Sequence, residues 1–377
     1  MKNIGLIVNP LAGMGGPAGM KGSDRAECVI RARELGIKPI AYGRAEDVLV
    51  RLKSGDTAEF RLYTAPGEMG EEEAKQAGYS PVVIGEIEGG NTSAEDTKRI
   101  AKLMVEQKLD LLVFVGGDGT ARDVCEAIGT DIPAMGIPSG VKMHSAVFTL
   151  HMAAAAQVLS EFINKGAVED EMREVMDLDE EAYTGGRVSA KLDGYLRVPH
   201  VRRLFQSLKA GGGTGNGGDP RAIAGNIFDR MKKETEYTYL IGAGSTTMAV
   251  KNALGIDGTL LGVDVVKDGR LMEKDVCSCQ LEEIAKRDKI KIIVTPIGGQ
   301  GFIFGRGNQQ FSPGVIRAAG RQNIMVICTP GKLTALEGQP LLVDTGSEET
   351  DKMLHGYMRL ITGRKDETVY RIAPTLD

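Results

Sequence analysis

Short apolar runs alternate with amphipathic stretches over the first 160 residues of the chain. The runs 3–9, 110–116 and 133–138 are rich in β-forming residues, and each ends at or beside a glycine or a proline. The run 110–116 is almost continuously apolar, which is typical of a strand buried on both faces of a parallel sheet. Further strands are expected at 37–42, 60–64 and 81–87.

Helical periodicity separates these runs. The clearest helix is 92–109, where Ile100 and Met104 lie four residues apart on one face and Asn91 or Thr92 is expected to cap the N-terminus. Repeated β-α-β units predict an N-terminal doubly wound, Rossmann-like α/β domain. Further helices are expected at 45–53, 121–128 and 143–164.

The pattern changes after this domain. The segment 174–199 consists of strand-like runs joined by turns, and the glycine-rich segment 210–220 is typical of a surface linker or of a mobile lid. Residues 236–335 return to strand–helix alternation, and Asp219 and Ser312, each followed by proline, are expected to begin helices. The predicted parts are a nucleotide-binding α/β domain at 1–165, a β-rich, mixed α-β acceptor-binding domain at 166–340, and a C-terminal segment at 341–377 that packs back on the first domain.

Composition and charge narrow the classes of partner. The chain has 46 basic and 51 acidic residues, a net charge of −5 and no tryptophan, so neither a phosphate-backbone partner nor base stacking is expected. The longest apolar stretch, 147–159, is too short to cross a bilayer, and the N-terminal run is typical of a strand rather than of a signal peptide. The five cysteines are scattered, which favours free thiols in a reducing compartment. We therefore expect a cytoplasmic protein with no membrane or nucleic-acid partner.

The most informative segment is GGDGT, at the end of the buried strand 110–116. Parallel α/β sheets bind ligands outside the carboxyl ends of their strands, where Asp118 would lie. The adjoining glycines let the chain turn and let a ligand approach, and Thr120 is expected to cap the next helix, whose N-terminus favours a phosphate. The motif predicts a nucleotide-phosphate site, with a structural turn as the alternative. Neither a Walker A motif nor G-x-G-x-x-G is present here.

The GGDGT motif resembles the signature shared by NAD kinases, diacylglycerol kinases and sphingosine kinases. Three other stretches are similar to this superfamily in the same order: IVNPLAGMGG at 7–16, GIPSGVKMHSAV at 136–147 and GAGSTTMAV at 242–250. The likeness is greatest to the ATP-NAD kinase-like branch that includes proteins associated with acetoin catabolism. This resemblance implies the two-domain fold of the NAD kinase type.

The resemblance also implies a reaction. It indicates magnesium-dependent transfer of a phosphoryl group from ATP to a hydroxyl group, which in NAD kinases is the 2′-hydroxyl of the adenosine ribose of NAD. Asp118 matches the proposed base or metal-linked acid, whereas the ligands of the metal are unknown. Asp193, Gln300 and Arg306 are weaker candidates for binding the acceptor. The nucleotide-binding candidates are Asn9, Gly116, Gly117, Gly119, Thr120, Pro138, Ser139, Gly140, Lys142, Gly244, Ser245 and Thr246.

Two departures from the family pattern leave other functions open. Thr247 and Met248 stand where NAD kinases have Ala-Tyr, and the Asn-Glu/Asp pair that grips NAD has no clear counterpart. A lipid kinase of the diacylglycerol or sphingoid class is one alternative, although no basic amphipathic helix supports it. A non-catalytic nucleotide-binding regulator is another. The donor, ATP or polyphosphate, is not determined, and a homo-oligomer, a dimer or tetramer, is expected.

Overall fold

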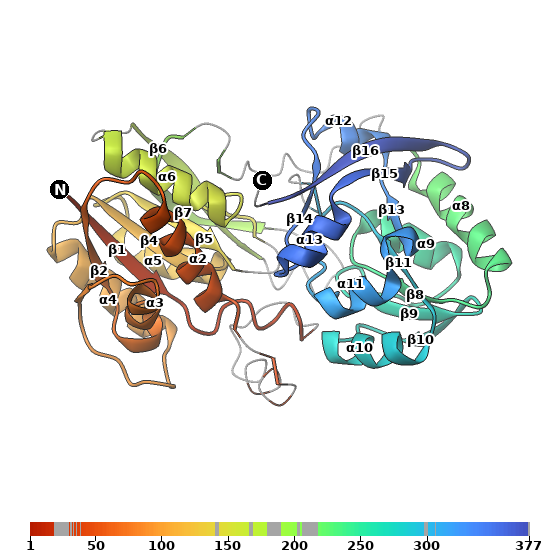
Figure 1. Cartoon of the computed structure of the whole chain (residues 1–377), viewed down its shortest axis with the longest axis horizontal. Helices are drawn as coiled ribbons and strands as arrows, with labels where there is room; N and C mark the ends of the chain where they lie inside the picture. Colours follow the sequence, from red (N-terminus) through yellow and green to blue (C-terminus); the bar gives the residue numbers. More distant parts are fainter. Residues whose placement is uncertain are drawn as a thin grey trace. The chain divides into compact units, whose positions relative to one another are not determined.

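The computed structural model contains two compact units (Figure 1). The first unit consists of Met1–Met14 and Lys38–Leu208, and the second of Gly15–Ile37 and Lys209–Asp377. The structure describes the chain except for residues 19–29, 31, 33, 35, 38, 140–142, 166–168, 179–189, 202–203, 206–217, 298–300, 306 and 376–377.

The first unit is built on a five-stranded parallel sheet in the order β3-β2-β1-β4-β5. The chain runs outward from β1 to β3, then returns to the other side of β1 for β4 and β5. The topological switch point, where doubly wound sheets bind ligands, therefore lies between β1 and β4. The strands are β1 (Lys2–Val8), β2 (Phe60–Thr64), β3 (Val82–Val83), β4 (Leu111–Gly116) and β5 (Ala134–Pro138).

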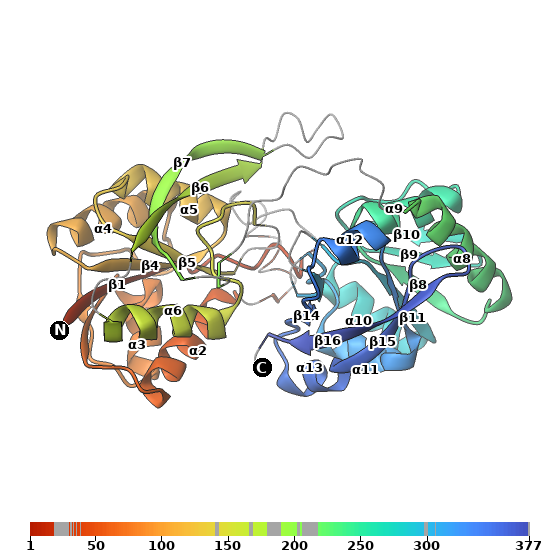
Figure 2. The ribbon, with the colours of Figure 1, turned by 90° about the horizontal axis from the view of Figure 1, so that it is seen from above.

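Helices cover both faces of this sheet. Figure 2 shows α2, α3 and α6 on one face and α4 and α5 on the other. The α4 helix is capped by Ser93, which forms a capping box with Asp96, so the expected cap at Asn91 or Thr92 is wrong. The helices are α2 (Ala41–Ser54), α3 (Glu71–Gln76), α4 (Ala94–Glu106), α5 (Asp118–Ile128) and α6 (Met152–Lys165), with a 3-10 turn η1 (Gly67–Met69) before α3.

A two-stranded hairpin, β6 (Asp170–Leu178) and β7 (Ala190–Pro199), also belongs to the first unit. The buried side chains Val175, Leu196 and Val198 join the core of this unit, and both strands contact α5. The expectation of strands in this region is confirmed. Their placement in a second domain beginning at 166 differs from the structure, because the hairpin has an apolar face that the first unit buries.

The second unit is also α/β, on a nine-stranded mixed sheet in the order β10-β9-β8-β11-β13-β15-β16-β14-β12. The strands β8, β11, β13 and β15 are parallel to one another, whereas β16 is antiparallel to β15. The strands are β8 (Thr238–Ile241), β9 (Asp264–Lys267), β10 (Arg270–Glu273), β11 (Ile290–Val294), β12 (Phe302–Phe304), β13 (Ile324–Ile327), β14 (Leu341–Val343), β15 (Gly356–Ile361) and β16 (Glu367–Pro374).

Helices cover both faces of the second sheet as well, with α8 and α9 on one face and α10, α11 and α13 on the other (Figure 2). Asp219 and Ser312 cap α8 and α11 with their side chains, and proline follows each, as predicted. The helices are α8 (Pro220–Lys233), α9 (Ser245–Ala253), α10 (Ser278–Arg287), α11 (Pro313–Ala319), α12 (Pro330–Thr334) and α13 (Glu348–Leu354), with a 3-10 turn η3 (Arg321–Asn323) before β13.

The C-terminal segment corrects the sequence interpretation. Residues 341–377 supply β14, β15 and β16 to the sheet of the second unit, rather than packing on the first. The expected strand at 37–42 is also wrong, since α2 begins at Ala41, and the expected helix from 143 begins only at Met152. In the part of the chain that the structure describes, no helix has the length and apolarity needed to cross a membrane.

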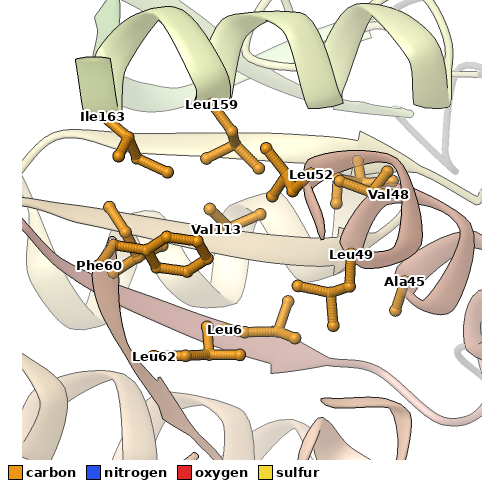
Figure 3. A pocket seen from close by; sticks show the side chains of 12 residues that line it. Leu6, Ala45, Val48, Leu49, Leu52, Phe60, Leu62, Val113, Leu159 and Ile163 are labelled. Carbon is orange, nitrogen blue, oxygen red and sulfur yellow. The ribbon is translucent and has the colours of Figure 1, made fainter. Parts of the chain in front are cut away.

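An apolar pocket lies inside the first unit, between the sheet and helices α2 and α6 (Figure 3). Its walls include Leu6, Leu49, Phe60, Val113 and Leu159, and all twelve lining side chains are apolar. Ligand sites carry a few polar groups that orient the ligand, and this pocket has none on its lining side chains. It therefore belongs to the hydrophobic core and not to the candidate site.

Candidate functional site

The candidate site of the first unit begins at Asn9, directly after β1 and beside the switch point. Its Nδ2 atom donates a hydrogen bond of 2.9 Å to Thr120 Oγ1, and its Oδ1 atom accepts one of 3.0 Å from Leu11 N. The Asn9 backbone N–H also donates to Val115 O, at 2.9 Å. Asn9 thus joins the end of β1 to the first turn of α5, and fixes the relative position of the two strand ends where a ligand is expected.

The turn between β4 and α5 requires glycine at position 116. A Cβ atom there would lie 2.3 Å from Thr120 Oγ1 and 2.4 Å from Thr120 Cβ, distances at which atoms overlap. Gly117, in an extended conformation, is the N-cap of α5, and Gly119 lies within the first turn. The sequence interpretation of Thr120 as the cap is therefore wrong, because the helix already begins at Asp118.

Asp118 is 7% exposed, and its carboxylate is held by the loop that follows β5. Its Oδ2 atom accepts a hydrogen bond of 2.7 Å from His144 N. Its Oδ1 atom accepts bonds of 3.0 Å from Ser145 N and 2.6 Å from Ser145 Oγ. The acid between the two glycines is thus hydrogen-bonded to the second motif predicted from the sequence, and the fold brings 116–120 together with 143–145.

Ser139 adds a polar group beside the GGDGT turn. Its backbone N–H donates a hydrogen bond of 2.9 Å to Gly116 O, directly after Pro138 ends β5. The side chain is 1% exposed, and its Oγ atom has no hydrogen-bond partner among the described residues. A buried hydroxyl without a partner is uncommon, and one at the carboxyl end of a parallel strand fits a site that a ligand completes. Gly140 and Lys142 lie outside the described residues.

Asp193 is placed in the first unit, on strand β7 at the register shift of the hairpin. Its side chain is exposed, and its charge acts on the Cys125 thiol of α5. Burial, more than the Asp193 charge, raises the pKa of Cys125. A role of Asp193 in binding the acceptor stays a prediction.

In the second unit, the turn after β8 carries the other glycine motif. Gly244 has a φ of +127° and is the N-cap of α9, where Ser245 is exposed and Thr246 is buried. Asn308, which is fully buried, accepts a hydrogen bond of 3.1 Å from Ala243 N and donates one of 3.0 Å to Ile303 O. Asn308 thus ties the segment that follows β12 to this turn. Gln300 and Arg306, which belong to the glycine-rich stretch 295–314, lie outside the described residues.

A buried ion pair that no sequence motif indicated supports the same turn. Lys251 Nζ lies 2.8 Å from Asp264 Oδ2, and both side chains are fully buried. Burial lowers the pKa of Lys251, although the neighbouring Asp264 carboxylate opposes this effect. The pair holds the loop 259–262, since Lys251 Nζ donates to Thr259 O at 2.7 Å. Within that loop, Leu260 O accepts a hydrogen bond of 2.8 Å from Gly244 N.

Among the described residues, no group of three or more His, Cys, Asp or Glu side chains is arranged to hold a metal ion. Mg²⁺ in phosphoryl-transfer sites is commonly bound by one or two carboxylates together with phosphate oxygens and water, so it needs no such cluster. Asp118 is the one carboxylate within residues 116–120, and the site fits Mg²⁺ held in this second way.

Comparison with protein families gives two matches. Residues 4–168 match the ATP-NAD kinase N-terminal domain, and residues 234–372 match the ATP-NAD kinase C-terminal domain. The first match contains Asn9, Asp118 and Ser139, and the second contains Gly244. No curated protein matches the sequence.

Comparison with solved structures gives distant likenesses. The S. aureus MnaA-UDP co-structure is 11% identical with a TM-score of 0.27, and covers 90% of this chain and 83% of its own. The Neisseria meningitidis UDP-GlcNAc 2-epimerase bound to UDP-GlcNAc is 10% identical with a TM-score of 0.23, and covers 94% of this chain and 74% of its own. Likenesses this weak support no conclusion about the fold or the reaction.

Proposed function

The chain belongs to the ATP-NAD kinase family, and from this we propose that it transfers the γ-phosphoryl group of ATP to a hydroxyl group of NAD or of a related nucleotide-like acceptor. The 2′-hydroxyl of the adenosine ribose of NAD is the first candidate acceptor. The family assignment supports a kinase of the NAD kinase type. That NAD is the acceptor, that ATP is the phosphoryl donor and that the reaction uses Mg²⁺ are parts of the proposal.

The observation that carries this proposal is the arrangement around the switch point of the first sheet. Asn9, the Gly116–Thr120 turn and Ser139 follow β1, β4 and β5, which are neighbours in the sheet. Hydrogen bonds therefore link residues from the ends of three strands along one edge of the sheet. The N–H groups at the start of α5 and the partnerless Ser139 hydroxyl are the donors that a phosphate group would use there.

Phosphoryl transfer requires little covalent chemistry from a protein, and depends mainly on positioning and on electrostatic stabilisation. The hydrogen bonds from His144 N, Ser145 N and Ser145 Oγ fix the position of the Asp118 carboxylate. A carboxylate held in this way can orient the acceptor hydroxyl or metal-bound groups. When bound, Mg²⁺ would neutralise charge on the phosphate oxygens.

The direct test is to incubate the purified chain with ATP, Mg²⁺ and NAD and to measure NADP. The proposal predicts NADP that accumulates in proportion to enzyme and to ATP consumed. Inorganic polyphosphate in place of ATP identifies the donor, and a panel of nucleosides and hydroxylated cofactors identifies another acceptor. Absence of a phosphorylated product from every acceptor and both donors would contradict the proposal.

A non-catalytic nucleotide-binding regulator is the second candidate, and the hydrogen bonding of Asp118 favours it. A carboxylate that holds the 143–145 loop has a structural role that needs no reaction. Under this alternative, ATP or NAD would raise the melting temperature of the chain without any ATP being consumed. The matches to the ATP-NAD kinase domains favour a nucleotide acceptor over the lipid acceptor. A cytoplasmic location, a homo-oligomeric state and the acetoin-related branch remain expectations from the sequence.

A further inference from the structure

The edge of the first sheet that carries Asn9 continues from β1 to the turn that follows β2. This turn, residues 65–70, contains η1 and leads into α3. Ala65 N donates a hydrogen bond of 3.1 Å to Leu6 O of β1, and a Cβ atom at Gly70 would lie 3.2 Å from the same carbonyl oxygen. The turn therefore packs against β1 close to Asn9, at the edge where doubly wound sheets bind their ligands.

Glu68 lies in this turn, with one carboxylate oxygen fixed and the other open. Its Oε1 atom accepts a hydrogen bond of 2.8 Å from Gly90 N, in the loop that follows β3. Its Oε2 atom takes part in no hydrogen bond or ion pair among the described residues, and the side chain is only partly buried. The fold thus determines the orientation of the Glu68 carboxylate and leaves one oxygen for a ligand.

The other acidic side chains of this segment are not available in the same way. Both carboxylate oxygens of Glu71 accept hydrogen bonds, one from a backbone N–H and the other from Lys75 Nζ. Glu73 is 2% exposed, so a ligand outside the turn does not reach it. Glu72 is exposed, and no hydrogen bond among the described residues fixes it. Of these four acidic side chains, Glu68 alone combines a fixed position with an open oxygen.

Beneath the turn, Thr64 ends β2 with an unpaired polar group. Its side chain is fully buried, and its Oγ1 atom has no hydrogen-bond partner among the described residues. Thr64 lies against the turn, since a Cβ atom at Gly70 would lie 3.7 Å from Thr64 Cβ. A buried hydroxyl without a partner is uncommon. The hydroxyls of Thr64 and Ser139 are thus both unpaired at the carboxyl ends of strands, which fits an edge that a ligand completes.

The charge at this end of the edge selects the kind of group that binds. Burial raises the pKa of Glu73, and the charges of Glu72, Glu68 and Glu46 add to the rise, so several carboxyl groups lie close together here. They repel a phosphate group, which the N–H groups at the start of α5 favour instead. A hydroxyl group, by contrast, donates a strong hydrogen bond to a fixed carboxylate. The two parts of the edge therefore suit the sugar and the phosphates of one nucleotide.

We propose that Glu68 binds the ribose hydroxyls of an adenosine nucleotide whose phosphates lie at the start of α5. In dinucleotide-binding sheets with the same strand order, an acidic residue that follows the second strand hydrogen-bonds a ribose hydroxyl. The inference deepens the proposed function and rests on it for the presence of a nucleotide at this edge. ATP and NAD both contain an adenosine ribose, and the experiment distinguishes the two.

The test measures nucleotide binding to the full chain by calorimetry. The ligands are ATP and NAD, each compared with its analogue that lacks the 2′- and 3′-hydroxyls of the adenosine ribose. Glu68→Gln keeps an oxygen for Gly90 N and replaces the open carboxylate oxygen by an NH₂ group, which does not accept a hydrogen bond. Glu72→Gln is the matched control, because it removes the same charge from an exposed neighbour. A lost hydrogen bond to a charged group weakens binding about tenfold to a hundredfold.

The inference predicts that Glu68→Gln weakens the binding of ATP, of NAD or of both by this factor, and leaves the binding of the corresponding dideoxy analogue unchanged. The wild type should bind that analogue about as weakly as Glu68→Gln binds the parent nucleotide. Weaker ATP binding alone assigns the ribose to the donor, and weaker NAD binding alone assigns it to the acceptor. Unchanged affinity for both nucleotides, an equal loss for the analogue or in Glu72→Gln, or no binding of either nucleotide to the wild-type chain would overturn the inference.

The measurement separates this inference from the proposed function. A wild-type chain that binds a nucleotide through Glu68 but forms no phosphorylated product refutes the kinase and leaves the inference standing. A Glu68→Gln variant that binds both nucleotides and forms NADP as the wild type does refutes the inference and leaves the kinase.

Discussion

The hydroxyl of Ser145 lies 2.6 Å from Oδ1 of Asp118, and it also accepts a hydrogen bond of 3.0 Å from Met176 N. Ser145 therefore joins the GGDGT motif, the loop after β5 and strand β6 of the hairpin at one fully buried atom. This contact explains why the aspartate can lie between glycines at the end of a buried strand, since it has partners even without a ligand.

Replacement of Ser145 by alanine leaves Asp118 and Met176 each without one partner. We expect Ser145→Ala to lower the free energy of unfolding by about 1–3 kcal/mol, the usual effect of leaving buried polar groups unsatisfied. Urea denaturation measures it. Ser54→Ala is the control, because the Ser54 hydroxyl is bonded only locally to Val50 O on an exposed turn of α2, and it should change stability by less than about 0.5 kcal/mol. Equal stabilities of the two variants would contradict this role of Ser145.

The turn at Gly116 gives a steric prediction. A Cβ atom at this position overlaps Thr120, so Gly116→Ala should destabilise the chain by about 1–3 kcal/mol and weaken nucleotide binding. Gly43→Ala is the matched control, since Gly43 lies in α2 with open space around it and alanine favours a helix. Thermal denaturation of both variants should give shifts of opposite sign. A Gly116→Ala chain as stable as the wild type would show that the turn tolerates a side chain.

The buried pair in the second unit gives a larger effect. Removing one partner leaves the other charge buried and unpaired, so Lys251→Met should cost about 3–5 kcal/mol. The control is Lys274→Met. The Lys274 Nζ atom lies 2.7 Å from Asp257 Oδ2, and the Asp257 side chain is almost fully exposed. Because an exposed pair contributes little, this control should differ from the wild type far less than Lys251→Met does in chemical denaturation. Lys251→Met should also weaken nucleotide binding, because Lys251 holds the loop whose Leu260 O accepts a hydrogen bond from Gly244 N. If Lys251→Met and Lys274→Met were equally stable, the result would argue against a buried pair.

Glu73 in α3 predicts a dependence of stability on pH. It is 2% exposed, its Oε2 atom has no hydrogen-bond partner, and burial, reinforced by the charges of Glu72, Glu68 and Glu46, raises its pKa to about 7. Between about pH 4.5 and 7, Glu73 therefore keeps its proton in the folded chain, whereas in the unfolded chain, with the ordinary pKa of 4.5, it has lost it. Stability should fall as the pH rises from about 4.5 to 7, by up to about 3 kcal/mol, and stay low above pH 7.

Glu73→Gln should remove this fall and make the chain more stable than the wild type at pH 8. Glu71→Gln is the contrasting variant. A hydrogen bond from Lys75 lowers the pKa of Glu71, so the contribution of Glu71 to the stability of the chain is lost as the pH falls. Urea denaturation at several pH values between 4.5 and 8 measures both slopes. A wild-type chain and a Glu73→Gln chain with parallel profiles would refute the assignment.

The parts of the fold that local signals determine were predictable from the sequence. Asp219 and Ser312 cap helices because a side-chain oxygen before a proline at N1 suits a helix start wherever the segment lies. The GGDGT turn was likewise recognised from its residues alone, although its cap is Gly117 rather than Thr120.

The parts that depend on distant contacts were not predictable. The hairpin β6–β7 is held in the first unit because Val175 and Leu196 are buried in its core. These apolar side chains could have packed equally well against the apolar face of another sheet. The pairing of Lys251 with Asp264 and the reach of Lys332 to Thr295 join segments that no motif connects. Such contacts depend on strand order, and the sequence carries no local signal for it.

The measurement that tests the central claim most directly compares NADP formation by the wild-type chain and by Asp118→Asn, with ATP, Mg²⁺ and NAD at saturation. Asparagine keeps the shape of the side chain but removes its charge. We predict a loss of turnover of at least a hundredfold, with ATP affinity within about tenfold of the wild type. Turnover by Asp118→Asn equal to that of the wild type would contradict the account.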